Sequence, residues 1–216
     1  MGLNKSELTP KRKSQSWSAL LVLLCLAVGL GAAEKKTLLF FGDSLTAGYG
    51  VDPDEAYPAL IQQRVDAAGL PWRIVNAGLS GETTAGGLRR LDWILRQQVD
   101  IFVIELGGND GLRGIPPATT RANLEAMIRR IRERQPAIKI VVAGMQLPTN
   151  MGPEHTREFA AIYPEIAREQ DAVLIPFLLA GVGGVPDLNL PDGIHPTPQG
   201  HAIVADTVWA VLKPLL

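Results

Sequence analysis

The sequence predicts an α/β fold in which a parallel sheet of five strands is covered by helices on both faces. Short apolar runs alternate with longer segments in which apolar residues recur every three or four positions, as in amphipathic helices. The runs are apolar throughout, which is typical of parallel strands that helices bury on either side. No internal repeat, low-complexity tract or interdomain linker interrupts the alternation, so we expect one globular domain over residues 34–216.

The expected strands and helices follow one another in strict alternation. The strands are residues 38–41, 73–76, 101–106, 138–143 and 173–176. The helices are residues 56–68, 84–98, 119–134, 157–170 and 198–212. Each strand is a short apolar run, whereas each helix shows helical spacing of its apolar residues. In a sheet of this kind, ligands bind beyond the carboxyl ends of the strands, near the point where the strand order reverses.

Residues 1–33 are expected to be an export signal and not part of the domain. Four basic side chains precede an apolar run over residues 17–31, and small residues occupy positions 31–33. The apolar run is short for a membrane span and suits a signal peptide. We therefore expect a periplasmic or secreted protein with no stable membrane span after cleavage. An uncleaved N-terminal membrane anchor is the alternative.

Charge and cysteine content narrow the function classes further. The chain has a net charge of −1, and because residues 1–33 are basic, the remainder is mildly acidic. Such a surface argues against a nucleic-acid partner. Cys25 is the single cysteine and lies inside the expected signal. Cleavage after Ala33 would leave a protein with neither a disulfide nor a thiol nucleophile.

A serine stands where the first predicted strand breaks into a glycine-rich loop. Ser44 follows the apolar run at 37–41, with glycines at positions 42, 48 and 50. A serine hydroxyl attacks only when a base removes its proton and fixed donors stabilise the charge that passes to the substrate oxygen. Asp192 and His195, close together near the other end, supply a carboxylate and a base. A simple Asp/Gly turn is the alternative interpretation of the Ser44 loop.

The residues around His195 favour a working base. Pro196 restricts the histidine's backbone, Thr197 can cap the last helix and Pro198 can begin it. The alternative is a helix-entry turn with a solvated histidine. His201 falls within the last predicted helix, and His155 lies in a polar loop where it could line a substrate cleft.

Loops after the second and third strands can supply oxyanion donors. Small residues around Gly81 precede a helix, where backbone N–H groups are unpaired and can face an anion. Asn109 follows the third strand, and its side-chain amide can donate without adding a charge. Asp43 and Asp110 adjoin these loops and are expected to tie them together by hydrogen bonds, with a direct part in catalysis as the alternative. Glu105 is a polar residue in an apolar strand and is expected to pair with a buried donor.

Four segments match, in order, the motif blocks of the GDSL or SGNH hydrolases. They are GDSLTAGYG from position 42, NAGLSGETT from position 76, ELGGNDGLRG from position 105 and DGIHP from position 192. The resemblance runs from about residue 36 to the C-terminus. Within that family the chain most resembles the bacterial periplasmic thioesterase and lysophospholipase enzymes and the related arylesterases.

The resemblance implies a flavodoxin-like three-layer α/β/α fold. It implies that Ser44 is the nucleophile, His195 the base and Asp192 the carboxylate that orients it. It also implies an oxyanion hole formed by the Ser44 and Gly81 N–H groups and the Asn109 side chain. No metal or organic cofactor is implied, and the expected partner is a small-molecule acyl ester, thioester or lysophospholipid.

Three functions remain open at this point. The first is an exported hydrolase of thioesters, aryl esters or lysophospholipids, which an apolar pocket would favour. The second is a carbohydrate acetylesterase, which would have an open polar cleft. The third is a non-catalytic lipid- or nucleotide-binding domain, although no GxGxxG or P-loop pattern follows the first strand. From their positions on loops over the catalytic edge, the expected acyl-binding residues are Leu112, Ile115, Leu147 and Met151.

Overall fold

The computed structural model describes Met1, Gly2 and residues 35–216. The export signal expected at residues 1–33 lies outside the described residues, apart from its first two positions, and stays a prediction. Among the residues described, no helix has the length and apolar character that crossing a bilayer requires.

The predicted parallel sheet is confirmed. Its strands lie in the order β2-β1-β3-β4-β5, and every neighbouring pair is parallel. The strands are β1 (Lys36–Gly42), β2 (Trp72–Asn76), β3 (Ile101–Glu105), β4 (Lys139–Ala143) and β5 (Val173–Ile175). Side chains along β1 and β3 are almost entirely buried, because helices cover both faces of the sheet.

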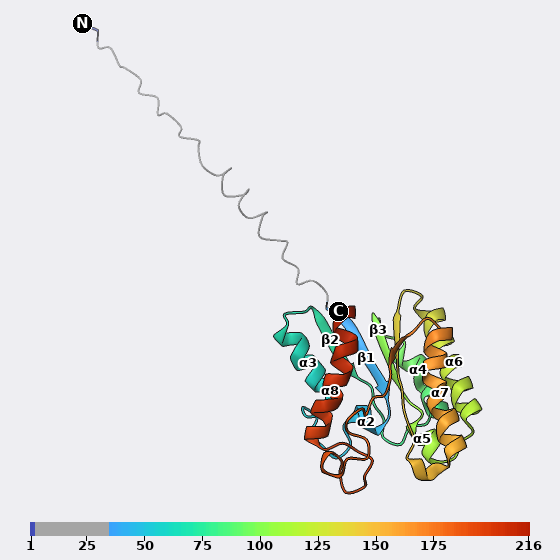
Figure 1. Cartoon of the computed structure of the whole chain (residues 1–216). Helices are drawn as coiled ribbons and strands as arrows, with labels where there is room; N and C mark the ends of the chain where they lie inside the picture. The colour runs from blue at the N-terminus through green and yellow to red at the C-terminus, as the bar shows by residue number, and fades with distance from the viewer. Residues whose placement is uncertain (3–34) are drawn as a thin grey trace. The chain divides into compact units, whose positions relative to one another are not determined.

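Helices form the two outer layers, as a three-layer fold requires. Figure 1 shows α3 (Tyr57–Ala67) and α8 (Pro198–Leu212) on one face of the sheet, and α4, α6 and α7 on the other. The second layer comprises α4 (Thr84–Ile94), α6 (Pro117–Arg134) and α7 (Pro153–Glu169). The remaining elements are the short helices α2 (Ser44–Ala47) and α5 (Gly108–Leu112) and the single turns η1 (Thr149–Met151), η2 (Pro186–Leu188) and η3 (Lys213–Leu215).

Differences from the predicted bounds are confined to element ends and short helices. Helix α7 begins at Pro153, four residues before the expected start at 157, because a proline fits the first turn of a helix. Helix α4 ends at Ile94, short of the expected end at 98. Helices α2 and α5 were not expected, since elements of that length are too short to show a period.

The strand order places a reversal point between β1 and β3. From β1 the chain crosses to β2 on one side, and from β3 it crosses to β4 on the other, so the loops leaving these two central strands diverge. In the register of the pair, Gly42 at the end of β1 lies beside Glu105 at the end of β3. The loop that carries Ser44 therefore starts next to a buried carboxyl group.

Glu105 clamps the start of that loop. Its Oε2 accepts hydrogen bonds from Thr46 Oγ1 at 2.7 Å and from the backbone N–H of Asp43 at 3.2 Å. Tyr57 shares a further hydrogen bond of 2.7 Å with the Thr46 hydroxyl. A Cβ at Gly42 would overlap both Glu105 Oε2 and Thr46 Oγ1, so the clamp needs glycine at that position. Glu105 thus finds the buried donors that the sequence suggested it needs.

The clamp brings two buried carboxyl groups close together. Burial, and then the charge of Asp43, raise the pKa of Glu105 well above its usual value. Burial also raises the pKa of Asp43 to about 6, despite the opposing hydrogen bonds from Leu45 and Asn109. Glu105 Oε1 has no hydrogen-bond partner among the described residues, which favours the neutral acid for Glu105. Asp43 then carries the negative charge of the pair near neutral pH.

A raised pKa at Asp43 predicts a specific dependence of stability on pH. The folded state binds this proton more tightly than the unfolded state, whose carboxyl has a pKa of about 3.8, so stability falls as pH rises from about 4 to about 6. Asp43→Asn removes the buried charge. We expect the difference in unfolding free energy, variant minus parent, to rise by on the order of 2 kcal/mol between about pH 4 and about pH 7, because only the parent loses stability as Asp43 ionises.

Urea unfolding at both pH values measures this gain, and Asp54→Asn, which changes an exposed carboxylate, is the matched control. Parallel stability profiles for the parent and Asp43→Asn would contradict a raised pKa at Asp43.

Candidate active site

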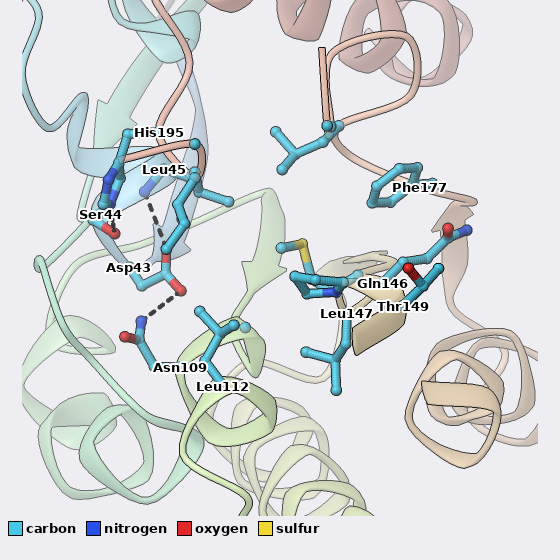
Figure 2. Close-up of a pocket in the computed structure, with 18 residues that line it drawn as sticks. Asp43, Ser44, Leu45, Asn109, Leu112, Gln146, Leu147, Thr149, Phe177 and His195 are labelled. Atoms are coloured by element: carbon cyan, nitrogen blue, oxygen red, sulfur yellow. Dashed lines mark hydrogen bonds between the residues drawn. The ribbon is translucent and has the colours of Figure 1, made fainter. Parts of the chain in front are cut away.

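Ser44 is the first residue of α2, directly after the clamped end of β1. The N-cap of this short helix is Asp43, whose Oδ1 accepts a hydrogen bond of 3.0 Å from the N–H of Leu45. In the first turn of a helix, backbone N–H groups have no partner within the helix. The Ser44 hydroxyl lies at the edge of a pocket and faces the His195 ring (Figure 2).

The structure brings Ser44, His195 and Asp192 together although they are far apart in the sequence. His195 Nε2 lies 2.9 Å from Ser44 Oγ, and His195 Nδ1 lies 2.7 Å from Asp192 Oδ2. The other carboxylate oxygen, Asp192 Oδ1, accepts hydrogen bonds from the N–H groups of Ile194 and His195 at 2.9 and 3.0 Å. One carboxylate thus fixes both the turn and the ring of the histidine. With Asp192 accepting at Nδ1, Nε2 is free to take the serine proton.

Backbone contacts hold the histidine loop between η2 and α8. The N–H of Leu190 donates to the carbonyl of His195 at 2.7 Å, so the loop folds back on itself. The side-chain amide of Asn189 donates to the carbonyls of Val182 and Val185 at 2.7 and 2.8 Å. Thr197 caps α8 by accepting from the N–H of Gly200, as the sequence predicts. His195 is therefore fixed at the entrance to a helix.

Asp192 remains ionised over a wide pH range. Partial burial opposes its ionisation, but the hydrogen bonds from the N–H groups of His195 and Ile194 and from the imidazole together outweigh burial and lower its pKa to about 2. Since the Asp192 side chain is 37% exposed, water screens part of its charge. A carboxylate beside Nδ1 would stabilise an imidazolium if Nε2 took a proton.

Asn109 lies in the first turn of α5, with its amide turned towards the Ser44 loop (Figure 2). Its Nδ2 donates to Asp43 Oδ2 at 3.0 Å. Because a side-chain amide has two N–H bonds, the second remains for a substrate oxygen. Gly81 has a φ of 78°, and its carbonyl accepts from Arg113 at 3.0 Å, but Gly81 does not line the pocket. Its expected contribution to an oxyanion hole stays a prediction.

The pocket beside Ser44 is a cavity of about 510 Å³ with a mainly apolar lining. Figure 2 shows Ser44 and His195 on one side, with Phe177, Leu147 and Gln146 across from them. Of the expected acyl-binding residues, Leu112 and Leu147 line the cavity, whereas Ile115 and Met151 do not. Its apolar side chains are those of Leu45, Leu112, Met145, Leu147, Pro148, Phe177, Leu179 and Ile194.

The other two histidines and Asp110 form hydrogen bonds that support the fold and do not line the pocket. His201 is buried, its Nδ1 accepts from the N–H of Tyr57 at 3.3 Å, and burial lowers its pKa to about 4. His155 contacts the carbonyl of Gly111 at 3.3 Å and does not line the pocket. Asp110 is buried and accepts from the backbone and hydroxyl of Thr84, so it ties two loops together as the sequence suggested.

Sequence reasoning missed several residues that shape this edge of the sheet. Phe177 follows the carboxyl end of β5 and lines the cavity. Because ligands bind beyond the carboxyl ends of parallel strands, its position in the sequence was the signal that could have identified it. Arg90 on α4 donates to the carbonyls of Gly42 and Ala77 at 3.3 and 2.8 Å and pairs with Glu82. It braces the loops after β1 and β2, and no motif or spacing marked it.

Comparisons with known proteins agree with this architecture. Residues 40–203 match the model of the GDSL-like Lipase/Acylhydrolase family. The chain is 43% identical over 201 residues to Esterase TesA of Pseudomonas aeruginosa, covering 92% of this chain and 99% of that protein. It is 37% identical over 186 residues to thioesterase 1/protease 1/lysophospholipase L1 of Escherichia coli, covering 86% and 87% of the two chains.

A solved structure of TesA is also similar. It superposes with a TM-score of 0.80 at 43% sequence identity, covering 84% of this chain and 100% of that one. The family model spans most of the described domain, and both curated relatives align along most of their own length. The chain therefore belongs to the GDSL-like lipase/acylhydrolase family and is a carboxylic-ester hydrolase.

Proposed function

We propose that the protein hydrolyses acyl esters and thioesters through a covalent acyl-enzyme on Ser44. The observation that supports this most strongly is the continuous set of contacts from Asp192 to His195 to Ser44, at 2.7 and 2.9 Å. A nucleophile, a base within reach of it and a third group that orients the base are what activates a serine.

The reaction proceeds in two steps. In the first, His195 Nε2 removes the Ser44 proton while Ser44 Oγ forms a bond to the acyl carbon. The bond from that carbon to the leaving oxygen or sulfur then breaks, and His195 gives its proton to the leaving group. In the second step His195 takes a proton from water, the resulting hydroxide attacks the acyl carbon, and Ser44 leaves with the proton restored.

Donors beside Ser44 stabilise the oxyanion of each tetrahedral intermediate. The proposed donors are the N–H groups of Ser44 and Gly81 and the side-chain amide of Asn109. Asp43 supports this role because its Oδ2 accepts a hydrogen bond of 3.0 Å from Asn109 Nδ2, which leaves the second N–H of that amide for the substrate oxygen. Because Asp43 is buried, the amide is fixed before substrate arrives and needs no rearrangement during the reaction.

The cavity favours an acyl chain over a sugar as the bound group. Leucine, methionine and phenylalanine side chains dominate its walls, and its volume of about 510 Å³ is within the range of small-molecule sites. A sugar would need a set of polar groups to satisfy its hydroxyls. We therefore prefer acyl esters and thioesters, including aryl esters and lysophospholipids, to carbohydrate acetyl esters. A purely binding role would leave the Asp192–His195–Ser44 contacts without a purpose.

Substitutions at the proposed catalytic residues separate chemistry from binding. Ser44→Ala removes the nucleophile and should abolish turnover of p-nitrophenyl esters. Asn109→Ala removes one oxyanion donor and should lower kcat by about 10²–10³-fold. Asp192→Asn should lower kcat by orders of magnitude, because an amide can hold His195 in the wrong tautomer. Circular dichroism and thermal melting establish that each variant is folded.

Trp93→Ala, a change at an exposed residue of α4, is the control and should keep parental kcat. His201→Ala is a poorer control, since the buried ring accepts a hydrogen bond from Tyr57. If folded Ser44→Ala turned over p-nitrophenyl esters at the parental rate, with contamination excluded, the proposed function would have to be abandoned.

The cavity lining predicts which residues set the acyl-chain preference. Leu147→Ala and Leu112→Ala remove apolar volume from the wall, so the optimum in a series of p-nitrophenyl esters should move to longer chains, with kcat/KM ratios changing about tenfold. Ile115→Ala and Met151→Ala are the matched controls. These two residues lie three and four positions after Leu112 and Leu147 in the chain and do not line the cavity. An unchanged optimum in the lining variants would show that the acyl chain binds elsewhere.

Export is also proposed, from the sequence of residues 1–33 alone. A basic stretch, an apolar run and small residues before Glu34 fit a cleavable signal. We expect the mature protein in the periplasm or medium to begin near residue 34, as intact mass measurement after cell fractionation would show. Recovery of membrane-bound protein that retains residues 1–33 would support the anchor instead.

A further inference from the structure

Tyr49 is an exposed aromatic residue beside the proposed catalytic base. It belongs to the loop after α2, and 52% of its surface is accessible to solvent. Its ring centroid lies 4.5 Å from that of the His195 imidazole, with the two ring planes tilted by 43°. The contact leaves about half of the residue uncovered, next to the atoms that transfer protons.

The backbone on both sides of Tyr49 has an unusual conformation. Gly48 and Gly50, on either side of it, have φ values of 77° and 81°, which side chains other than glycine rarely adopt. The N–H of Tyr49 donates to the carbonyl of Ser44 at 3.0 Å, so the tyrosine is anchored on the nucleophile's own residue. Single exposed aromatic residues are ordinary on protein surfaces. Tyr49 differs from these because its backbone N–H is hydrogen-bonded to Ser44 and its ring contacts the ring of His195.

Tyr49 lies outside the pocket that the acyl chain would enter. The residues that line that cavity include Ser44, Ile194 and His195, but not Tyr49. In acyl transfer the leaving group must reach His195 Nε2, because this nitrogen supplies its proton. If the acyl group occupies the cavity, the leaving group is the part that remains outside it, beside His195. An exposed ring in contact with that histidine is then in reach of the leaving group.

We propose that Tyr49 forms a leaving-group subsite that favours esters of aromatic alcohols, an inference that rests on the proposed function. The planar leaving group packs on the exposed Tyr49 ring while Ser44 Oγ forms its bond to the acyl carbon. As the bond from that carbon to the aryl oxygen breaks, the oxygen takes the proton that His195 had removed from Ser44. Aromatic pairing of this kind increases kcat/KM by about 3- to 10-fold over a leaving group without a ring.

Paired substrates with one acyl group test the subsite. The butyryl esters of phenol and of an aliphatic alcohol are compared, and the ratio of variant to parent kcat/KM is taken within each substrate, so that intrinsic reactivity cancels. Tyr49→Ala should lower kcat/KM for the phenyl ester several-fold more than for the aliphatic ester. Tyr49→Phe keeps the ring and should restore the aryl selectivity. Trp93→Ala, which removes an aromatic residue that is 65% exposed on α4, should leave both substrates unaffected.

Inhibition by phenol gives a second measurement, which tests binding at the subsite without any acyl transfer to phenol. Phenol is the product of the phenyl ester and should compete for the subsite, so its inhibition constant should rise several-fold in Tyr49→Ala. Equal losses on both esters, with unchanged phenol inhibition, would mean that Tyr49 only supports His195, and unchanged kinetics would mean that it has no role. Either result overturns the subsite. Neither bears on Ser44 as nucleophile, which the Ser44→Ala variant tests separately.

Discussion

The hydrogen bonds that Glu105 accepts from Thr46 and from the Asp43 backbone are the contacts on which the rest of the site depends. They form because the register of β1 against β3 places Gly42 beside Glu105, which is fully buried in the core. Glycine at position 42 leaves room for the carboxyl group, and the loop turns at once into α2. Ser44 is therefore positioned by the sheet itself, through groups that water does not reach.

Through Asp43, this clamp also positions Asn109, another of the proposed catalytic groups. Asp43, with its backbone held by Glu105, uses its carboxylate to orient Asn109 from the neighbouring strand end. Burial and the charge of Asp43 raise the pKa of Glu105, which favours its neutral acid, because two adjacent buried charges would repel strongly. Keeping Asp43 ionised near neutral pH lowers the stability of the fold. In the proposed mechanism the same carboxylate holds the Asn109 amide in place as an oxyanion donor.

Much of this arrangement could be predicted from the sequence. Continuous apolar runs predicted the parallel strands, and loops at their carboxyl ends predicted that Ser44 and Asn109 would meet. The sequence also places Asp192 and His195 close together, and in the structure the N–H groups of Ile194 and His195 both donate to one carboxylate oxygen of Asp192.

Other features could not be predicted, for physical reasons that differ between residues. Leu112 lines the cavity and Ile115 does not. Leu112 ends the helix α5, which is too short to show a period, so no pattern in the sequence gives the direction of either side chain. Arg90 braces two loops by donating to backbone carbonyls, which carry no sequence signature. The buried position of His201 depends on the packing of α8 against α3, a tertiary contact between distant segments.

Covalent labelling tests whether His195 activates Ser44 as the nucleophile. An alkyl fluorophosphonate should form a bond between its phosphorus and Ser44 Oγ, with loss of fluoride, because this chemistry requires an activated serine. Peptide mass spectrometry of the labelled protein should locate the adduct at Ser44, and His195→Ala should form it orders of magnitude more slowly. Labelling at another residue, or equally fast labelling of Ser44 without His195, would mean that His195 does not activate Ser44.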